Sequence, residues 1–283
     1  KRLVIVGVNR HEWSAKTGRV IGIKEMVSDI RCMTRNNINA VRTCHYPDQI
    51  PWYYMCDEAG IYVMAETNLE SHGSWQKLGA IEPSWNIPGS VPQWKEVLVD
   101  RARSNYETFK NHTSIIFWSL GNESYAGDDI EAMNDYFKEK NDGRLVHYEG
   151  SYYTREYEDT ISDVESRMYA KPYEIEEYLS NNPKKPYLLC EYMHDMGNSM
   201  GGLGSYMKLI DKYEMYQGGY IWDFIDQALL VKDEVTGKEV LRYGGDFDDR
   251  PYDYEFAGNG IVFATRKEKP AMQEVRYYYG MYK

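Results

Sequence analysis

Eight short apolar segments divide this chain, and stretches with helical spacing of apolar residues separate them. The segments cover residues 3–13, 39–47, 61–73, 114–124, 145–150, 164–170, 186–199 and 218–227. Strands that alternate with helices lie parallel in one sheet, because each helix carries the chain back to the start of the next strand. The alternation therefore predicts an α/β fold.

Eight strand–helix units in 283 residues match a (β/α)8 TIM barrel. The alternative is an open, doubly wound sheet, which usually has a glycine-rich turn after its first strand. Here Gly7 is followed by Val-Asn-Arg-His, with no GxGxxG, and no Walker sequence occurs in the chain. We therefore predict a single (β/α)8 barrel over residues 1–283, with residues 228–283 as a loop-rich tail that ends in a helix. Because the sequence enters its first apolar segment without an initiator Met, we expect the barrel to be a piece of a longer multidomain chain.

Composition narrows the class of protein. The chain has 33 Lys and Arg against 44 Asp and Glu, so a net charge of −11 argues against a nucleic acid or an anionic membrane as partner. No apolar run approaches the roughly 18 residues of a membrane-spanning helix. The four cysteines form no CxxC, and the chain is too large for a disulfide scaffold. We expect reduced, mostly buried cysteines and a cytoplasmic protein.

Polar residues follow the apolar segments rather than precede them. The active site of a (β/α)8 barrel lies at the C-terminal ends of its strands, so this position is the expected one. Five of the six histidines fall there, and so do many acidic residues; the set is His11, Glu12, His45, Glu66, Glu70, His72, Asn122, Glu123, His147, Glu149, Tyr169, Glu191, His194, Trp222, Asp223 and Asp226. A lone histidine is most simply a buried core residue, but this clustering favours a site.

Glu123 and Glu191 each follow an apolar strand directly. Two carboxylates that face each other in a partly dry barrel mouth can divide the work, one with a raised pKa as acid and one ionised as nucleophile. Glycoside hydrolysis uses this arrangement. From position alone, two structural, salt-bridged glutamates remain an alternative. Asn122, beside Glu123, can hold a sugar hydroxyl, but Gly121-Asn122 is also a good turn dipeptide.

Three weaker patterns accompany the two glutamates. Glu70 and His72, with a third carboxylate, form an oxygen-rich ligand set with one imidazole, which favours Mg²⁺ or Mn²⁺; a site without metal fits the same pattern. Trp222 offers a flat ring for stacking on a sugar or for core packing. An acidic run that lacks the EF-hand spacing predicts a solvated loop instead of a calcium site; it comprises Asp246, Asp248, Asp249 and Asp253.

Seven strings together resemble the catalytic barrel of glycoside hydrolase family 2, and within it the LacZ-type bacterial β-galactosidases. The strings span the chain in order: GVNRHEW, VRTCHYP, ETNLESHG, FWSLGNES, CEYMHDMGNS, QGGYIWDFIDQ and YGGDFDD. CEYMHDMGNS distinguishes this branch from β-glucuronidases and β-mannosidases. The resemblance implies a retaining glycosidase that cleaves terminal β-D-galactosyl residues from β-galactosides such as lactose by double displacement.

The resemblance also implies roles for residues. Glu191, in CEY, matches the nucleophile, and Glu123, in GNE, matches the general acid/base. Glu70 and His72, with Glu123, match ligands of an active-site Mg²⁺. The positions that match substrate-binding residues are His11, His45, Asn122, Tyr169, His194 and Trp222. The positions that match ligands of a Na⁺ ion near the galactose 6-hydroxyl are Phe256 and Asn259.

The chain departs from the family pattern in three respects. Tyr125-Ala126-Gly127 replaces the common GHG after GNES, and Trp13 replaces a His after HE. Family members also carry β-sandwich domains before and after the barrel, which supply an Asp to the Na⁺ site and part of the acceptor pocket. We expect such domains, or a homo-oligomer, as partners in the full-length protein. Two alternatives stay open: a barrel fragment that folds but is inactive or only binds sugar, and a family member that acts on another β-glycoside.

Overall fold

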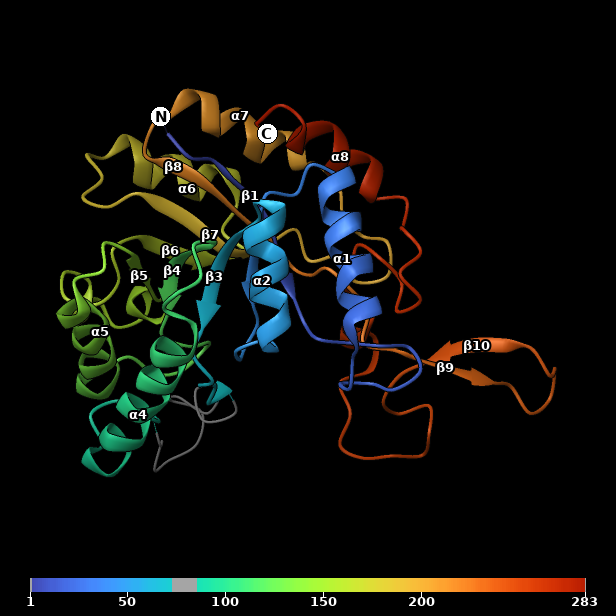
Figure 1. The fold of residues 1–283 in the computed structure, drawn as a ribbon. Coiled ribbons are helices and arrows are strands. Elements are labelled where there is room, and N and C mark those ends of the chain that lie inside the picture. The colour runs from blue at the N-terminus through green and yellow to red at the C-terminus, as the bar shows by residue number, and fades with distance from the viewer. Residues whose placement is uncertain (1, 73–85, 283) are drawn as a thin grey trace.

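A computed structural model describes residues 2–72 and 86–282 (Figure 1). Within them, eight parallel strands form one sheet in the order β5-β4-β3-β2-β1-β8-β7-β6. The strands are β1 (Ile5–Arg10), β2 (Ala40–Thr43), β3 (Tyr62–Glu66), β4 (Ile115–Ser119), β5 (Leu145–His147), β6 (Glu165–Met168), β7 (Tyr187–Tyr192) and β8 (Tyr216–Ile221). Because the first strand pairs with the eighth, the sheet curls into a nearly closed barrel, and the predicted (β/α)8 fold is confirmed.

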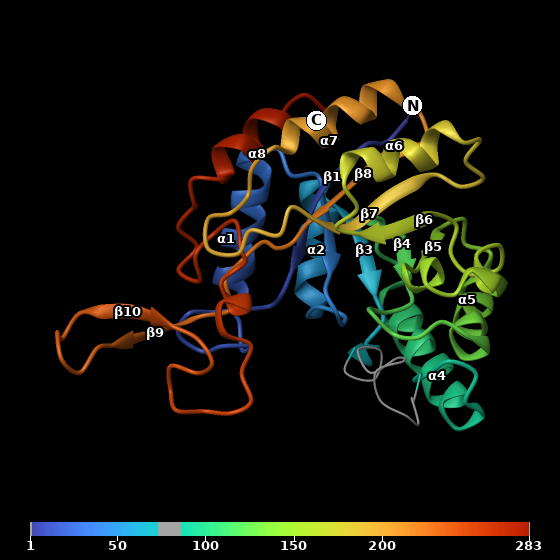
Figure 2. The ribbon, with the colours of Figure 1, turned by 180° about the vertical axis from the view of Figure 1, so that it is seen from behind.

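Helices surround the strands, as Figures 1 and 2 show from opposite sides. The described helices are α1 (Ile23–Arg35), α2 (Ile50–Ala59), α4 (Pro92–Phe109), α5 (Asp128–Lys140), α6 (Pro172–Ser180), α7 (Leu203–Lys212) and α8 (Met272–Tyr279). Local sequence sets their ends: α2 has Pro51 in its first turn and stops at Gly60, whose φ of 68° suits glycine. Helix α8 was predicted at the end of the tail and is present.

The inside of the barrel changes from apolar to polar along the strands. Side chains alternate between the two faces of a strand, so residues two apart share the inner face. Three pairs of inward residues show the change, namely Ala40 and Arg42, Met64 and Glu66, and Phe117 and Ser119. Near the N-terminal ends Tyr220 fills the interior so closely that a Cβ on Gly7 would lie 2.5 Å from its ring. The polar layer therefore lies at the C-terminal ends, where a barrel places its site.

The barrel has a seam between β5 and β6, which form no ladder within residues 86–282. Side chains and one backbone bond bridge the seam. The Val146 amide donates to Asp163 Oδ2 at 2.7 Å, and the Asp163 amide donates to the Val146 carbonyl at 2.8 Å. His147 Nε2 is hydrogen-bonded to Ser166 Oγ at 2.8 Å. These contacts complete the cylinder where the strands are short.

The tail differs from its predicted loop-rich form because it contains an antiparallel hairpin. Strands β9 (Leu229–Lys232) and β10 (Glu239–Arg242) form a two-stranded sheet that projects beside the barrel in Figure 1. Leu230 and Leu241 pack at the hairpin's base against a small cluster of buried alanines. The acidic run that follows is exposed, as predicted for a solvated loop.

Candidate active site

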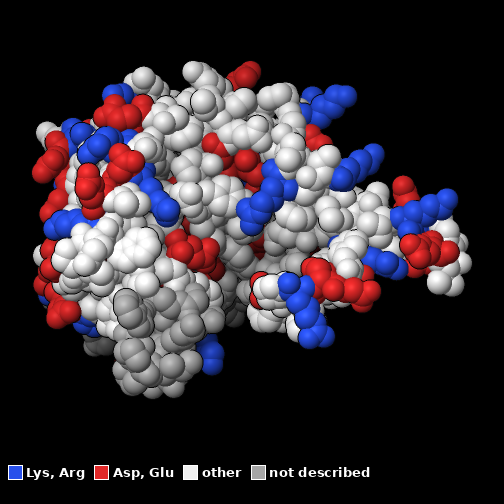
Figure 3. Space-filling view, turned by 90° about the horizontal axis from the view of Figure 1, so that it is seen from below, with Lys and Arg blue, Asp and Glu red and all other residues white. Residues whose placement is uncertain are grey.

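A cavity of about 790 Å³ lies at the C-terminal ends of the strands. Figure 3 looks onto this end of the barrel, which is hollowed, with acidic side chains inside the hollow. The residues that line the cavity are His11, Trp13, Arg19, His45, Glu70, His72, Glu123, Tyr169, Glu191, His194, Trp222, Gln227, Asp253, Phe256, Ala257 and Asn259. Of the predicted site residues, all line this cavity except Asn122, which lies buried beneath it.

Glu191 is the penultimate residue of β7, and both of its carboxylate oxygens accept hydrogen bonds. Arg42 donates to its Oε1 at 2.8 Å, and the Tyr169 hydroxyl donates to its Oε2 at 2.7 Å. Burial raises the pKa of Tyr169, and the charge of Glu191 adds to the rise, so the phenol keeps the proton that it donates. These two hydrogen bonds fix the orientation of the carboxylate and favour its negative charge.

Arg42 on β2 connects several polar residues under the cavity floor. It is fully buried and donates to Glu66 Oε2 at 2.6 Å, to Asn9 Oδ1 at 2.9 Å and to Asn122 Oδ1 at 2.8 Å, besides Glu191. A guanidinium has five donors in a fixed plane, so it can hold four acceptors at defined angles. Arg42 therefore sets the relative positions of the predicted nucleophile and the amide beside the predicted acid/base.

Glu66 ends β3 and orients a histidine of the cavity wall. Its Oε1 accepts from His45 Nδ1 at 2.7 Å. Burial alone would raise the pKa of Glu66, but Arg42 and His45 outweigh it, and the pKa lies below its ordinary value. The ionised Glu66 fixes His45 as the tautomer that carries its proton on Nδ1, and leaves Nε2 toward the cavity, 3.8 Å from Glu191 Oε1.

Glu123 lies opposite this network in a different environment. Its backbone has a φ of 37°, and its amide donates to Glu149 Oε1 at 2.6 Å. Burial raises the pKa of the Glu123 carboxyl, and the nearby charge of Glu191 raises it further. Glu191 therefore accepts hydrogen bonds from two donors, whereas Glu123 has a raised affinity for a proton, and this contrast suits a paired nucleophile and acid.

Glu70, His72 and Glu123 lie close enough to share a cation. One ligand atom from each lies within 4.8 Å of the others, and His72 Nδ1 is 3.2 Å from Glu123 Oε2. Asn122 Nδ2 donates to Glu70 Oε1 at 2.9 Å, which fixes that carboxylate. Two carboxylates and one imidazole at a partly exposed position form an oxygen-rich ligand set that suits Mg²⁺.

Aromatic rings form one wall of the cavity. Trp222 follows β8, stacks parallel on His45 with ring centroids 5.3 Å apart, and meets the edge of His11 at 5.6 Å. On another side, the His194 ring lies 5.8 Å from both Tyr169 and Phe256. Burial lowers the pKa of His194, so its imidazole is neutral near pH 7 and can both donate and accept.

Phe256 and Asn259 lie together in the loop before the last helix. Asn259 Nδ2 donates to the Phe256 carbonyl at 2.6 Å, while the buried Asn259 Oδ1 has no hydrogen-bond partner among the described residues. A buried amide oxygen without a partner is costly unless something else, such as an ion, binds it. The pair therefore fits the ligand role that the sequence resemblance implies.

Sequence reasoning did not single out four residues that build this site: Asn9, Arg42, Glu66 and Glu149. Two of them were noted only as polar groups after strands. The sequence signal that could have found Arg42 is the alternation of side chains between the two faces of a strand. Arg42 lies two residues after the inward Ala40, and an arginine inside a barrel needs acidic partners.

Among the described helices, none is both long and apolar enough to span a membrane. All four cysteines are buried and free, as expected.

Comparison with known proteins decides the family. The description "Glycosyl hydrolases family 2, TIM barrel domain" matches residues 1–283. The chain belongs to glycoside hydrolase family 2. Over its whole length it is 70% identical to the family member "Beta-galactosidase large subunit" of Lactobacillus helveticus, of which it covers 45%. It is 60% identical over 279 residues, 99% of the chain, to "Beta-galactosidase" of Halalkalibacterium halodurans, of which it covers 27%.

This family 2 chain therefore spans less than half the length of these curated relatives. Among solved structures, the β-glucuronidase of Ruminococcus gnavus matches with a TM-score of 0.69 over 99% of this chain and 50% of that one, at 19% identity. At that identity the likeness shows the fold alone.

Proposed function

We propose that this chain is the catalytic barrel of a retaining β-galactosidase that cleaves terminal β-D-galactosyl residues from β-galactosides such as lactose. The observation that carries the proposal is the contrast between two glutamates of one cavity. Glu191 accepts hydrogen bonds from Arg42 and Tyr169, while burial and Glu191 raise the pKa of Glu123. The names of the relatives support galactose as the sugar.

In the first step, Glu191 attacks the anomeric carbon and forms a covalent galactosyl-enzyme. The donors Arg42 and Tyr169 orient its carboxylate. Glu123, whose pKa is raised by burial and by Glu191, gives its proton to the leaving glycosidic oxygen. As Glu191 loses its charge on bonding to the sugar, the pKa of Glu123 falls, which favours proton release.

In the second step, Glu123 acts as a base. It removes a proton from a water molecule, which attacks the anomeric carbon and releases Glu191. Two displacements at one carbon retain the β configuration. The covalent intermediate and its hydrolysis thus use the same two carboxyl groups, with the proton on Glu123 first given up and then regained.

The remaining predicted residues bind the sugar. Trp222 presents a flat ring in the cavity wall, on which the C–H face of galactose can stack. His45, held by Glu66, and His194 offer imidazoles to sugar hydroxyls, and Asn122 is held by Arg42 beside Glu123. His11 lies at the edge of Trp222, where it faces the reacting sugar.

Two cations fit residues of the site. Glu70, His72 and Glu123 would hold Mg²⁺, which when bound supplies positive charge beside the acid/base carboxyl. The Phe256 carbonyl and the unpaired Asn259 Oδ1 would hold Na⁺, with further oxygen ligands from outside this chain or from the sugar. We also propose that flanking domains or further subunits complete the full-length protein, because the chain covers 45% of its relative from Lactobacillus helveticus.

Two substitutions in the full-length protein test the mechanism. Glu191→Gln should abolish hydrolysis of nitrophenyl galactosides, because no nucleophile remains. Glu123→Gln should spare bond cleavage for substrates with good leaving groups and block lactose, which needs protonation. Product analysis by NMR should show the β anomer first. Near-normal turnover by Glu191→Gln, or the α anomer as first product, would overturn the proposal.

A substrate panel tests the sugar. We expect galactosides to be cleaved faster than glucuronides or arabinopyranosides, because the proposed sugar contacts are neutral rings and amides. A glucuronide carries a carboxylate that would meet Glu70, Asp253 and the other acidic groups of the cavity. If the protein prefers another β-glycoside, the proposed mechanism stands but the proposed substrate is wrong.

A further inference from the structure

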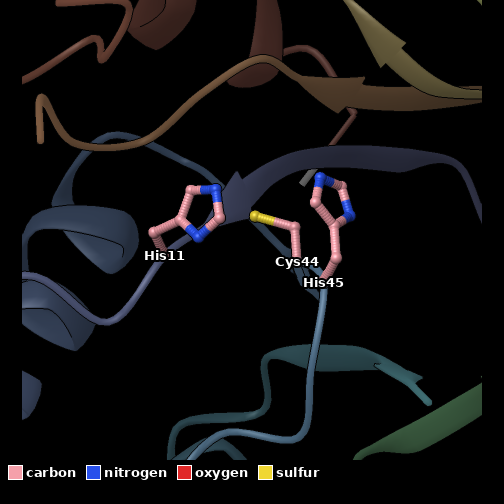
Figure 4. Close-up of side chains that lie close together, drawn as sticks. All are labelled: His11, Cys44 and His45. Carbon is pink, nitrogen blue, oxygen red and sulfur yellow. The ribbon is translucent and has the colours of Figure 1, made fainter. Parts of the chain in front are cut away.

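A second set of potential metal ligands lies in the cavity wall, apart from Glu70, His72 and Glu123. His11 follows β1, and Cys44 and His45 follow β2. One ligand atom of each lies within 4.8 Å of the other two. Figure 4 shows the Cys44 thiol between the two imidazole rings. Because both histidines line the cavity, an ion from solvent can reach this cluster.

Both imidazoles are already oriented for a ligand. His45 Nδ1 donates to Glu66 Oε1 at 2.7 Å, and His11 Nδ1 is hydrogen-bonded to the Tyr46 hydroxyl at 3.0 Å. In metal sites, a histidine commonly bonds a carboxylate or another polar group through one ring nitrogen and the metal through the other. The Nε2 atom of each ring is therefore the one that remains for an ion.

The protonation states of His11 and Cys44 determine which proton a bound metal ion must displace. Burial lowers the pKa of His11 well below its ordinary value, and neighbouring His45 lowers it further, so the ring is a neutral ligand. Burial raises the pKa of the Cys44 thiol, so the free protein carries the thiol form. A metal–sulfur bond therefore forms with release of the thiol proton to solvent, as at other cysteine metal sites.

A comparable cluster deeper in the barrel lacks these properties. His147, Glu149 and Cys190 also lie within ligand distance of one another. Both nitrogens of His147 are hydrogen-bonded to serines, Ser119 and Ser166, and all three cluster members are enclosed. Neither a free imidazole nitrogen nor an entry path remains there.

We propose that His11, Cys44 and His45 form a binding site for Zn²⁺, and that the bound ion excludes the sugar. One thiolate and two imidazoles suit Zn²⁺ far better than Mg²⁺, whereas the carboxylates of Glu70 and Glu123 favour Mg²⁺. The ion would bind the imidazole rings of His11 and His45, which both contact Trp222. Glu191 can serve as a further ligand, because its Oε1 lies 3.8 Å from His45 Nε2. The inhibitory effect, though not the binding, rests on the proposed function.

Direct binding is measured on the full-length protein with Co²⁺ as the probe, in excess Mg²⁺ to fill the carboxylate site. A thiolate-to-cobalt absorption band in the near ultraviolet should appear and should disappear when Zn²⁺ is added. Cys44→Ser and Cys44→Ala should lose the band. The matched control Cys32→Ser removes a thiol of helix α1 that contacts Asn36 and Glu268, and it should keep the band.

Inhibition is measured with the same proteins and a chromogenic β-galactoside. Zn²⁺ should inhibit competitively, and Cys44→Ser should raise the inhibition constant by about tenfold or more while turnover without Zn²⁺ is unchanged. If the cobalt band persists in both folded Cys44 variants, or if excess Mg²⁺ fully relieves the inhibition, the proposed Zn²⁺ site is wrong. If the band appears but the protein has no galactosidase activity, the Zn²⁺ site stands and the proposed function is wrong.

Discussion

At the scale of single residues, one buried guanidinium organises the acidic groups of the candidate site. Arg42 donates hydrogen bonds to Glu66, Glu191, Asn9 and Asn122. It therefore links β2 to both neighbouring strands, β1 and β3, and to the C-terminal ends of β4 and β7. Without it, two buried carboxylates would face each other with no counter-charge. Breaking a buried ion pair by removing one partner costs about 3–5 kcal/mol.

We predict that Arg42→Lys lowers kcat/KM of the full-length enzyme by about 100-fold or more and lowers the free energy of unfolding. A lysine keeps the charge but offers one compact ammonium in place of a planar fork, so it cannot hold both Glu66 and Glu191. Kinetics and urea unfolding measure the two effects. Arg35→Lys is the matched control, because Arg35 pairs with Glu268 at the surface and should change stability by less than about 1 kcal/mol. Equal effects of the two substitutions would contradict the assignment.

Glu149 predicts a pH dependence of stability. Burial raises its pKa from 4.5 to about 8, so between these values the folded protein keeps a proton that the unfolded chain has lost. Stability from this group is therefore lost as pH rises toward 8. His147, whose pKa is lowered by burial from 6.5 to about 3, acts in the opposite direction but only below about pH 6.5.

We therefore predict that Glu149→Gln makes the decline in unfolding free energy between about pH 6.5 and 8 shallower, by up to about 1 kcal/mol per pH unit. The glutamine has no proton to lose. Urea unfolding at a series of pH values measures the slope. Glu139→Gln, which changes an exposed carboxylate of α5, should leave the slope as it is. Parallel curves for Glu149→Gln and the parent protein would refute the prediction.

Sequence reasoning singled out most of the polar residues that line the cavity, and Asn122 beneath them, but it missed Arg42. His11, His45, Glu123 and Glu191 follow apolar runs, and the barrel geometry that the runs imply brings strand ends together. Arg42 lies in the middle of the segment 39–47 instead of near its end, so its position in the sequence does not mark it as a site residue. Its role depends on which face of β2 is inward, and on partners from three other strands, which a pattern in one segment does not reveal.

At the scale of elements, most of the eight strands were predictable because they are buried parallel strands rich in apolar residues. Strand β6, with the sequence ESRM, gives the weakest such pattern. The hairpin β9–β10 was not predicted, although two four-residue runs flank the polar turn at 233–238. Its strands are only half-buried and pack on a few alanines, so their apolar pattern is weak. Residues 73–85 lie outside the described residues, and so does Gly73, the last residue of the predicted third segment.

The seam between β5 and β6 is the weakest join of the barrel, and we predict that Asp163→Ala destabilises it. The substitution leaves the Val146 amide without its acceptor, and an unsatisfied buried donor costs about 1–3 kcal/mol. Urea unfolding should show this loss, and hydrogen exchange at Val146 should speed up. Asp159→Ala, which removes an exposed partner of Lys184, is the control. A stability loss equal in both variants, with exchange unchanged, would contradict a structural role for the bridge.

At the scale of the whole molecule, the described residues form one barrel core in a chain that is shorter than its curated relatives. The pairing of β1 with β8 makes the sheet a nearly closed barrel, and buried residues fill the space between strands and helices. Yet the chain covers 45% of its Lactobacillus helveticus relative. The exposed Phe256 lines the cavity beside Asn259, whose buried Oδ1 has no hydrogen-bond partner among the described residues.

We predict that residues 1–283 alone unfold in one cooperative transition but cleave lactose at least about tenfold less efficiently than the full-length protein. Folding depends on the core, which lies within the barrel, whereas catalysis depends on sugar placement, and a displacement of about 1 Å can cost 100-fold in rate. Differential scanning calorimetry and kcat/KM measure the two properties. Na⁺ should stimulate the full-length protein and have little effect on the barrel, because the Phe256 and Asn259 oxygens alone leave the ion mostly hydrated. Glu191→Gln in both proteins separates residual activity from contamination. An isolated barrel with full, Na⁺-dependent activity would show that the site needs nothing beyond these residues, and an unfolded one would show that the core needs its neighbours.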